Sequence, residues 1–385
     1  MKILTLVDHY LPGTRGGGQL RTVQNLVLGL PPGHDFWIVT RNRDHASSEP
    51  YPGLPVLRWV DVGRARVLYL PPDAETVARI GAIAGEAGAD LVYANSLFSR
   101  MTIRYLVARR LGLAARSPLL IAPRGECSPG ALGIRAFRKR AFLRLGWAAG
   151  LYRGALWQAS TERERDDVLR ALPRLAPEEV LIAPDLSGEP PPADVVRHEK
   201  VSGRARLVFI SRVARMKNLH FALRALATVR GEVTLDVFGP TDDPGYWREC
   251  EAEALRLPSN VSMRYRGELP PDRVVETFAA HDFSVLPTLG ENFGHVIFES
   301  LAARCPVVLS DRTAWPDLGR EGGGFTIPLE DPSRWTAALQ ACVDMGPETH
   351  EAMADRARVV ALGFVERLGP VRRNVEMFER CLRRA

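Results

Sequence analysis

Short apolar segments alternate with predicted helices along the whole chain, and this alternation limits the folds that it can adopt. In the first half the predicted strands are Ile3–Val7, Phe36–Thr40, Leu91–Tyr93 and Leu119–Ala122. In the second half they are Leu207–Ile210, Thr234–Phe238, Phe283–Leu286 and Pro306–Leu309. Helices such as Leu20–Leu30 and Pro271–Ala280 fall between them. Strands that alternate with helices predict layered α/β domains with parallel sheets.

The chain has 385 residues, which is too long for one typical core, so we expect two domains. The alternation breaks between Pro184 and Gly203, where the run from Gly188 to Pro192 is typical of a linker. We therefore expect an N-terminal domain at 1–185, a linker at 186–203 and a second domain at 204–363. The last segment, 364–385, is predicted to be one helix.

The composition excludes several classes of protein. The five cysteines form no CxxC pair, which argues against a zinc site or a disulfide framework and favours a reducing cytosol. The N-terminal apolar run is too short for a signal peptide, and no 18-residue apolar stretch exists to span a membrane. The net charge of +6 suits nucleic acid, an anionic membrane or a diphosphate ligand. No nucleic-acid-binding motif is present, so we do not expect nucleic acid as a partner.

The segment from Gly290 to Glu299 carries the strongest functional signal. Glu291 stands in a glycine-rich loop, and Glu299 follows eight residues later in the predicted helix. Eight helical residues rise about 12 Å, whereas the carboxyl pair of a glycosidase is about 5–9.5 Å apart. Unpaired amides at a helix N-terminus favour phosphate. The spacing therefore indicates an extended ligand held at both ends, such as a nucleoside diphosphate sugar.

This pattern resembles the Glu-x7-Glu signature of retaining GT-B glycosyltransferases of family 4. The run Ser310–Leu318 follows where a subset of that family has a similar segment, and the resemblance covers essentially the whole chain. It implies a GT-B fold, in which two doubly wound Rossmann-like domains face each other across a cleft. It also implies that the C-terminal helix returns to the N-terminal domain. The expected activity is the retaining transfer of a sugar to a hydroxyl acceptor, with no metal and no cofactor.

The resemblance assigns catalytic roles to three residues of the second domain. Arg212 and Lys217 match the pair of cations that holds the diphosphate, and Glu291 is expected to face the donor sugar. Cations fixed at the leaving phosphate stabilise the negative charge that grows there. In similar enzymes the acceptor attacks from the front face and the leaving phosphate takes its proton. Arg215 departs from the family pattern, so its role stays open.

Further residues are predicted to bind the donor. Glu299 is expected to reach the ribose, and the amides of Phe293, Gly294 and His295 are expected to hold the β-phosphate. His295 can equally be a packing residue. Backbone near Arg266 is the predicted partner of the base. In the first domain, a glycine loop with Gly17 and Gly18 resembles the loop that lies over the diphosphate. The resemblance implies a UDP-, GDP- or dTDP-sugar as the donor, and the residues do not distinguish these bases.

The acceptor side is predicted from segments that follow two strands of the first domain. Asn95 follows one strand, and Arg124 and Glu126 lie in a Pro-Arg-Gly segment after another. Many relatives carry a histidine near this segment, and this chain has none there. The acceptor is therefore left open between surface glycans, glycolipids and small natural products.

Two further sequence features and the function itself leave alternatives open. The basic amphipathic segment Ile134–Trp147 suits either an anionic membrane surface, which would make a cytoplasmic protein peripheral at the inner face, or an ordinary surface helix. Asp242-Asp243 lies in a Thr-Asp-Asp-Pro-Gly run, which favours a turn over a metal site. A nucleotide-sugar 2-epimerase and a catalytically inactive nucleotide-sugar-binding protein are the alternative functions.

Overall fold

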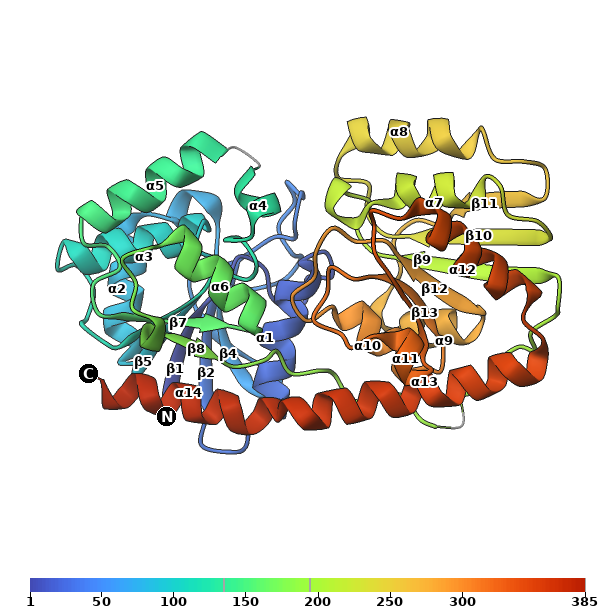
Figure 1. The fold of residues 1–385 in the computed structure, drawn as a ribbon. Coiled ribbons are helices and arrows are strands. Elements are labelled where there is room, and N and C mark those ends of the chain that lie inside the picture. The colour runs from blue at the N-terminus through green and yellow to red at the C-terminus, as the bar shows by residue number, and fades with distance from the viewer. Residues whose placement is uncertain (134–135, 194, 385) are drawn as a thin grey trace. The chain divides into compact units, whose positions relative to one another are not determined.

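The computed structural model describes residues 1–133, 136–193 and 195–384. Contacts between Cα atoms divide the chain into two compact units. Unit 1 contains Met1–Leu186 together with the C-terminal segment that begins at Gly369, and unit 2 contains Ser187–Leu368. Figure 1 shows the helices and strands of each unit.

Unit 1 is built on a sheet of eight strands among the described residues, in the order β3-β4-β2-β1-β5-β6-β7-β8. All of its strand pairs are parallel except β3–β4, which is antiparallel. The strands are β1 (Lys2–Leu6), β2 (Asp35–Arg41), β3 (Trp59–Val62), β4 (Ala65–Leu70), β5 (Leu91–Asn95), β6 (Leu119–Ala122), β7 (Ala155–Ala159) and β8 (Val180–Ile182). The helices are α1 (Gly17–Gly29), η1 (Pro72–Ala74), α2 (Val77–Ala87), α3 (Arg100–Arg110), α4 (Pro129–Gly133), α5 (Ala136–Ala148), α6 (Glu162–Ala171), η2 (Pro177–Glu179) and α14 (Pro370–Arg383).

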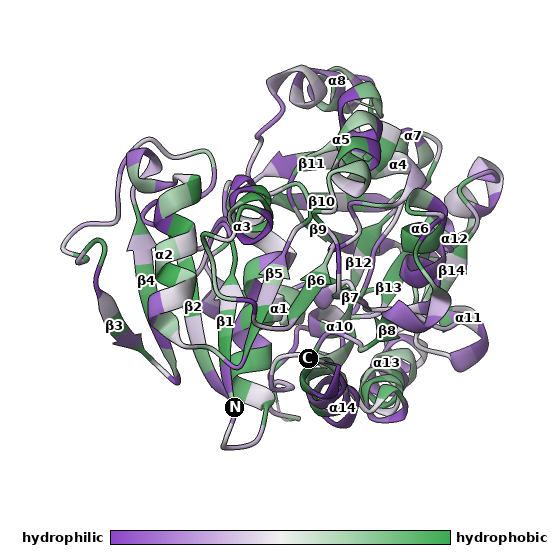
Figure 2. Ribbon diagram, turned by 90° about the vertical axis from the view of Figure 1, so that its left-hand side faces the viewer, coloured by the Kyte–Doolittle hydropathy of each residue, from purple (hydrophilic) through white to green (hydrophobic). Residues whose placement is uncertain are grey.

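The central strands of unit 1 are mostly apolar because both faces of the sheet are covered. Successive side chains of a strand point to opposite faces. Ile3 accordingly belongs to one buried cluster and Leu4 to the other. Figure 2 shows hydrophobic residues along the strands of both sheets.

Helix α14 packs on unit 1 and does not continue the helix before it. Phe378 is fully buried, and its ring centroid lies 5.4 Å from that of Tyr93. The sequence predicted one helix from residue 364, but α13 (Pro347–Leu368) ends before Gly369 and α14 begins after it. Gly369 adopts a left-handed φ of 54°, and Pro370 lacks the amide that a continuous helix would need. Ala385 lies outside the described residues.

Unit 2 is built on a parallel sheet of six strands among the described residues, in the order β11-β10-β9-β12-β13-β14. The strands are β9 (Arg204–Ile210), β10 (Glu232–Phe238), β11 (Val261–Tyr265), β12 (Phe283–Leu286), β13 (Val307–Ser310) and β14 (Gly324–Ile327). The helices are η3 (Arg215–Lys217), α7 (Leu219–Leu226), α8 (Pro244–Ala254), η4 (Pro271–Arg273), α9 (Val274–Ala279), α10 (His295–Ala302), α11 (Leu318–Glu321), α12 (Pro332–Asp344) and α13.

The prediction of two doubly wound α/β domains is confirmed by these two sheets. Each predicted strand overlaps an observed one. Five strands at or near the sheet edges, namely β3, β4, β7, β8 and β14, were not predicted, and of β11 only the end near Arg264 and Tyr265 was predicted.

Candidate functional site

The loops after β9 and β12 leave the second sheet side by side, because these strands are hydrogen-bonded neighbours at its centre. The chain runs outward from β9 through β10 to β11 and then returns to β12 on the other side. Open α/β sheets bind ligands at such a switch point, beyond the carboxyl ends of the strands. The loops that carry Lys217 and Glu291 both start there.

Lys217 and Glu291 meet at this edge of the sheet. The Lys217 ammonium donates a hydrogen bond to Oε1 of Glu291, although 74 residues separate the two in sequence. The side chains are 19% and 13% exposed, so a ligand can reach them, yet water screens their charges less than on an open surface. The fold thus places a cation and a carboxylate together where a ligand is expected.

Two features fix the loop that carries Lys217. One is a hydrogen bond within its own backbone, and the other is the close approach of Gly239, in the loop after β10. The Lys217 amide donates to the carbonyl oxygen of Ala214 at 2.8 Å, and Asn218 then adopts a left-handed φ of 60°. At Gly239 a Cβ atom would lie 2.0 Å from the Ser211 carbonyl oxygen, so only glycine allows this close approach.

Arg212 and Arg215 differ in their surroundings. Arg212 is exposed just beyond the carboxyl end of β9. Arg215 is held by Glu249, whose Oε2 lies 2.9 Å from Nη1, and this hydrogen bond raises the pKa of Arg215. The guanidinium of Arg215 therefore already has a carboxylate partner.

The loop that carries Glu291 is held by the segment after β13. The Glu291 amide donates to the carbonyl oxygen of Arg312 at 3.2 Å. The indole Nε1 of Trp315 donates to the carbonyl oxygen of Phe293 at 2.7 Å. Residues of the Ser310–Leu318 run therefore support this loop, a role that the sequence did not identify.

Helix α10 begins directly after this loop. Gly294 adopts a left-handed φ of 73°, and a Cβ atom there would lie 2.6 Å from Cδ1 of Ile297. The His295 ring lies 5.0 Å from the Phe293 ring, between centroids. Glu299 is half-buried on the same helix. The predicted phosphate and ribose contacts of these residues stay predictions.

Arg266 follows β11 at the outer edge of the sheet. Its amide donates to the carbonyl oxygen of Val237 at 2.9 Å, and its Nε lies 3.2 Å from Oδ1 of Asp236. The Tyr265 hydroxyl donates to the carbonyl oxygen of Gly239 at 2.9 Å. The loops after β10 and β11 are thereby joined, and the predicted base contact near Arg266 stays a prediction.

In unit 1 the predicted glycine loop opens α1. Gly17 has a left-handed φ of 62°, whereas a Cβ atom on Gly18 would meet only open space. The Asp44 carboxylate accepts hydrogen bonds from the amides of Thr14 at 2.8 Å and Arg15 at 3.1 Å. Asp44 therefore anchors the segment before the glycines. Sequence reasoning missed it, because a single carboxylate after a strand has no distinguishing pattern.

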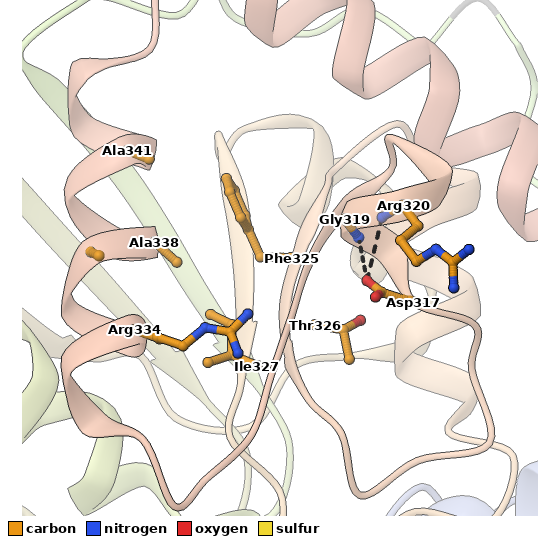
Figure 3. Close-up of a pocket in the computed structure, with 10 residues that line it drawn as sticks. Asp317, Gly319, Arg320, Phe325, Thr326, Ile327, Arg334, Ala338 and Ala341 are labelled. Carbon is orange, nitrogen blue, oxygen red and sulfur yellow. Dashed lines mark hydrogen bonds between the residues drawn. The ribbon is translucent and has the colours of Figure 1, made fainter.

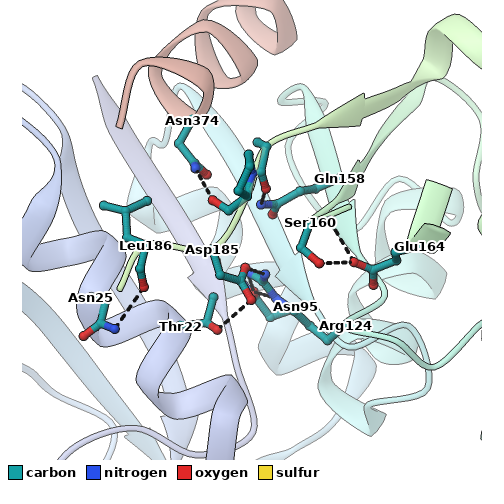
Figure 4. A network of polar contacts seen from close by, with 12 residues as sticks. Thr22, Asn25, Asn95, Arg124, Gln158, Ser160, Glu164, Asp185, Leu186 and Asn374 are labelled. Atoms are coloured by element: carbon teal, nitrogen blue, oxygen red, sulfur yellow. Dashed lines mark hydrogen bonds and ion pairs between the residues drawn. The ribbon is translucent and has the colours of Figure 1, made fainter. Parts of the chain in front are cut away.

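The predicted acceptor-side residues Asn95 and Arg124 belong to a buried polar network (Figure 4). Arg124 donates through Nε to Oδ1 of Asn95 at 3.0 Å and through Nη1 to Oδ1 of Asp185 at 2.6 Å. Burial would lower the pKa of Arg124, but Tyr93, Asp185 and Glu164 outweigh it and raise that pKa. This network gives Asn95 and Arg124 a structural role, and their contact with an acceptor stays a prediction.

Glu126 lies in the same loop as Arg124 but bonds to other partners. It accepts hydrogen bonds from the Ser96 hydroxyl at 2.6 Å and the Phe98 amide at 3.1 Å. Burial raises the pKa of this carboxyl above its ordinary value. Glu126 thus ties the loop after β6 to the loop after β5.

A separate pocket in unit 2 lies beside β14 (Figure 3) and contains none of the predicted site residues. It is lined by Asp317, Gly319, Arg320, Phe325, Thr326, Ile327, Arg334, Ala337, Ala338 and Ala341.

The remaining sequence features have ordinary surroundings. Asp243 caps α8 by accepting from the Tyr246 amide at 3.0 Å. Among the described residues, no group of three or more His, Cys, Asp or Glu side chains is arranged to hold a metal ion. The five cysteines are free and buried. Within the described ranges, every helix is too short or too polar to cross a bilayer.

Sequence comparisons match part of the chain. The family model for glycosyl transferases group 1 matches residues 204–345. The D-inositol 3-phosphate glycosyltransferase of Corynebacterium kroppenstedtii is 27% identical over 146 residues, which cover 36% of this chain and 32% of that protein. The enzyme of the same name from Kineococcus radiotolerans is 27% identical over 237 residues, covering 54% of this chain and 53% of that protein. The chain thus spans about a third to a half of these relatives.

Solved structures match the whole chain in fold. Sucrose-phosphate synthase from Thermosynechococcus elongatus has a TM-score of 0.73 at 17% identity and covers 100% of both chains. Anabaena Alr3699/HepE in complex with UDP and glucose has a TM-score of 0.71 at 17% identity, covering 98% of this chain and 99% of that one. At these identities the likeness shows that the fold is GT-B.

Proposed function

Because residues 204–345 match the family model for glycosyl transferases group 1, we propose that the chain is a retaining glycosyltransferase. It moves a sugar from a nucleoside diphosphate sugar to a hydroxyl group of an acceptor. The observation that carries this proposal is the contact between Lys217 and Glu291 at the switch point of the second sheet. Binding one nucleoside diphosphate sugar requires a cation for its diphosphate and a carboxylate for its sugar, and this contact brings such a pair together.

In this proposal the donor is held along its length. Arg212 and Lys217 bind the two phosphates, and Glu299 binds the ribose. The amides of Phe293, Gly294 and His295 hold the β-phosphate, which unpaired donors at a helix N-terminus favour. Backbone near Arg266 meets the base, and Gly17 and Gly18 lie over the diphosphate. Glu291 contacts the transferred sugar.

The proposed reaction is a front-face substitution. The bond between the anomeric carbon and the phosphate oxygen breaks, and the acceptor hydroxyl oxygen bonds to that carbon from the same face. The acceptor proton passes to the departing phosphate oxygen, so no protein nucleophile is required. Arg212 and Lys217 stabilise the negative charge that grows on the diphosphate.

The acceptor is proposed to meet residues of unit 1. Asn95 is the last residue of β5, and Arg124 and Glu126 follow β6, so all three lie at the carboxyl ends of strands, where ligands of such sheets bind. The name of the curated relatives makes D-inositol 3-phosphate the first small acceptor to test. Surface glycans and glycolipids are the larger candidates.

A peripheral membrane contact through α5 is part of this proposal, and it would suit a cytoplasmic enzyme with a lipid-linked acceptor. Phe137 is 86% exposed and Leu145 is 69% exposed. They lie eight residues apart on one face of α5, together with Ala141, because a helix repeats every 3.6 residues. Arg138, Arg140 and Arg144 are also exposed on α5. An apolar stripe flanked by cations suits an anionic bilayer surface. Ile134 and Arg135 of the predicted segment lie outside the described residues.

The test begins with donor binding and proceeds to product analysis. Thermal shift with UDP-, GDP- and dTDP-sugars identifies the donor, because a ligand of the folded state raises the melting temperature. UDP-glucose is the first choice, since Anabaena HepE has also been solved with it. A new α-linkage on an acceptor supports the transferase, whereas an altered free nucleotide sugar would indicate an epimerase. Binding without turnover would indicate an inactive binding protein.

A further inference from the structure

The hydroxyl of Thr288 lies where three loops of unit 2 meet. Thr288 follows β12 and is 0% exposed. Its Oγ1 lies 3.0 Å from the carbonyl oxygen of Met216 and 3.0 Å from that of Gly290. The amide of Gly290 donates back to the same Oγ1 at 3.2 Å.

These partners stand directly beside the two residues that meet at the site. Met216 precedes Lys217 and Gly290 precedes Glu291 in the chain. Oγ1 also lies 3.4 Å from Oε1 of Glu291 itself. A hydroxyl carries one proton, so it donates to one of these three acceptors at a time while it accepts from Gly290.

Thr288 is itself fixed by its neighbours. Its carbonyl oxygen accepts a hydrogen bond at 2.6 Å from the hydroxyl of Ser310, which is 0% exposed at the end of β13. The amide of Leu289 donates to the carbonyl oxygen of Met216 at 2.8 Å. The Thr288 hydroxyl therefore joins the loops after β9 and β12 from a position that the loop after β13 holds in place.

We propose that Thr288 is a positioning residue that sets the relative geometry of Lys217 and Glu291 for sugar transfer. This inference rests on the proposed function of the site. A fixed cation helps the departing phosphate only if it is already in place when the charge develops. A displacement of about 1 Å in such a site can cost about 100-fold in rate.

Three variants distinguish the effect of the Thr288 hydroxyl from the effect of side-chain volume. Thr288→Val keeps the shape and removes the hydroxyl, and Thr288→Ser keeps the hydroxyl. Thr326→Val is the matched control, because the Thr326 hydroxyl also accepts a backbone amide, that of Leu318 at the start of α11 at 3.0 Å, and this contact involves neither Lys217 nor Glu291. We expect Thr288→Val to lower kcat about tenfold or more while the KM for the donor changes less than about twofold. Thr288→Ser should recover most of the rate, and Thr326→Val should leave it unchanged.

Amide hydrogen exchange supplies a readout that does not need activity. Thr288→Val should speed the exchange of Leu289, Gly290 and Glu291, whereas Thr326→Val should not. A wild-type kcat in Thr288→Val, an equally slow Thr288→Ser, or unchanged exchange at these amides would overturn the inference. If the wild-type chain binds no nucleoside diphosphate sugar and transfers nothing, the proposed function fails, and the exchange rates still decide whether Thr288 holds the two loops.

Discussion

Lys217 contacts Glu291 through an ammonium–carboxylate hydrogen bond, which joins the loops after β9 and β12 at the centre of the second sheet. In the proposed reaction these groups bind adjacent parts of one donor, the diphosphate and the sugar. In that reaction a bound diphosphate would compete with Glu291 for the Lys217 ammonium. The contact therefore predicts that each side chain is needed for transfer.

Replacing Lys217 by alanine should abolish transfer while the protein stays folded. Loss of one group that stabilises the developing charge costs about 2.7–4 kcal/mol, or about 100- to 1,000-fold in kcat. The control is Arg215→Ala, which removes a nearby cation that is already paired with Glu249. Steady-state rates and melting temperatures of both variants check this. Equal losses in the two variants, or a wild-type rate in Lys217→Ala, would contradict the assignment.

Replacing Glu299 by alanine should suppress transfer at limiting donor concentrations, because it weakens donor binding. A carboxylate that accepts hydrogen bonds from ribose hydroxyls contributes about 1.5–3 kcal/mol, so the Kd for the nucleoside diphosphate should rise at least about tenfold. Calorimetric titration measures this. Glu276→Ala is the control, because Glu276 lies 68% exposed on α9 and pairs only with Arg273 among the described residues. Unchanged affinity in Glu299→Ala would remove the ribose role.

The fold was predictable where both faces of a strand are buried. Segments such as Ile3–Val7 and Phe283–Leu286 are buried throughout and apolar at all but one position, which is typical of central parallel strands. β3 was missed because it is a partly exposed antiparallel edge strand. β14 was missed because it is an edge strand that begins with Gly324 and has two half-buried residues, so it shows no apolar run.

Only part of the candidate site was predictable from the sequence, because some of its residues match a motif and others act through hydrogen bonds across the fold. Glu291 and Lys217 were identified because charged residues in glycine-rich or basic loops match a known motif. Thr288 and Asp44 act through hydrogen bonds to loop backbone, and such bonds depend on distances across the fold and leave no spacing in the sequence. Arg124 was identified as a polar candidate, but its network with Asn95 and Asp185 required the positions of strands far apart in sequence.

Replacing Gly294 by alanine should destabilise unit 2. A left-handed φ costs a residue with a side chain about 1–3 kcal/mol, and the new Cβ would also press on Ile297 at 2.6 Å. Gly290→Ala is the control, because its Cβ would meet only Cε of Met216 at 3.7 Å, an ordinary contact. Urea unfolding of both variants measures the difference. Equal stability of the two would mean that α10 does not need glycine at its start.

Asp282 should stabilise the protein at neutral pH and lose this effect in acid. Burial raises the pKa of Asp282, but hydrogen bonds from His198 at 2.8 Å and from the Arg206 amide at 2.6 Å outweigh it and hold the pKa below its ordinary value. A lowered folded-state pKa gives stability above the unfolded pKa of about 3.9, and this stability disappears as the pH falls through the folded pKa.

Asp282→Asn should therefore lower the free energy of unfolding by about 1–3 kcal/mol at pH 7. The difference in unfolding free energy between the wild type and Asp282→Asn should narrow below about pH 4, where the Asp282 carboxyl of the unfolded chain begins to take up its proton while that of the folded protein is still ionised. Urea unfolding from pH 7 to pH 3 checks this, with Asp355→Asn as the control, because that carboxylate is 64% exposed. If the difference in unfolding free energy between the wild type and Asp282→Asn stays constant with pH, the charge of Asp282 does not contribute to stability.

The exposed stripe on α5 predicts salt-sensitive binding to anionic membranes. Each arginine near such a surface contributes about 1 kcal/mol, and salt weakens this attraction. The double variant Phe137→Glu/Leu145→Glu should lose flotation with phosphatidylglycerol liposomes at low salt, because it removes the apolar contact and adds negative charge. Leu255→Glu is the control, since Leu255 is 88% exposed beyond α8 in the other unit. Neutral phosphatidylcholine liposomes should float neither protein. If the wild type stays with the unbound fraction at low salt, or if the double variant floats as well as the wild type, α5 is an ordinary surface helix.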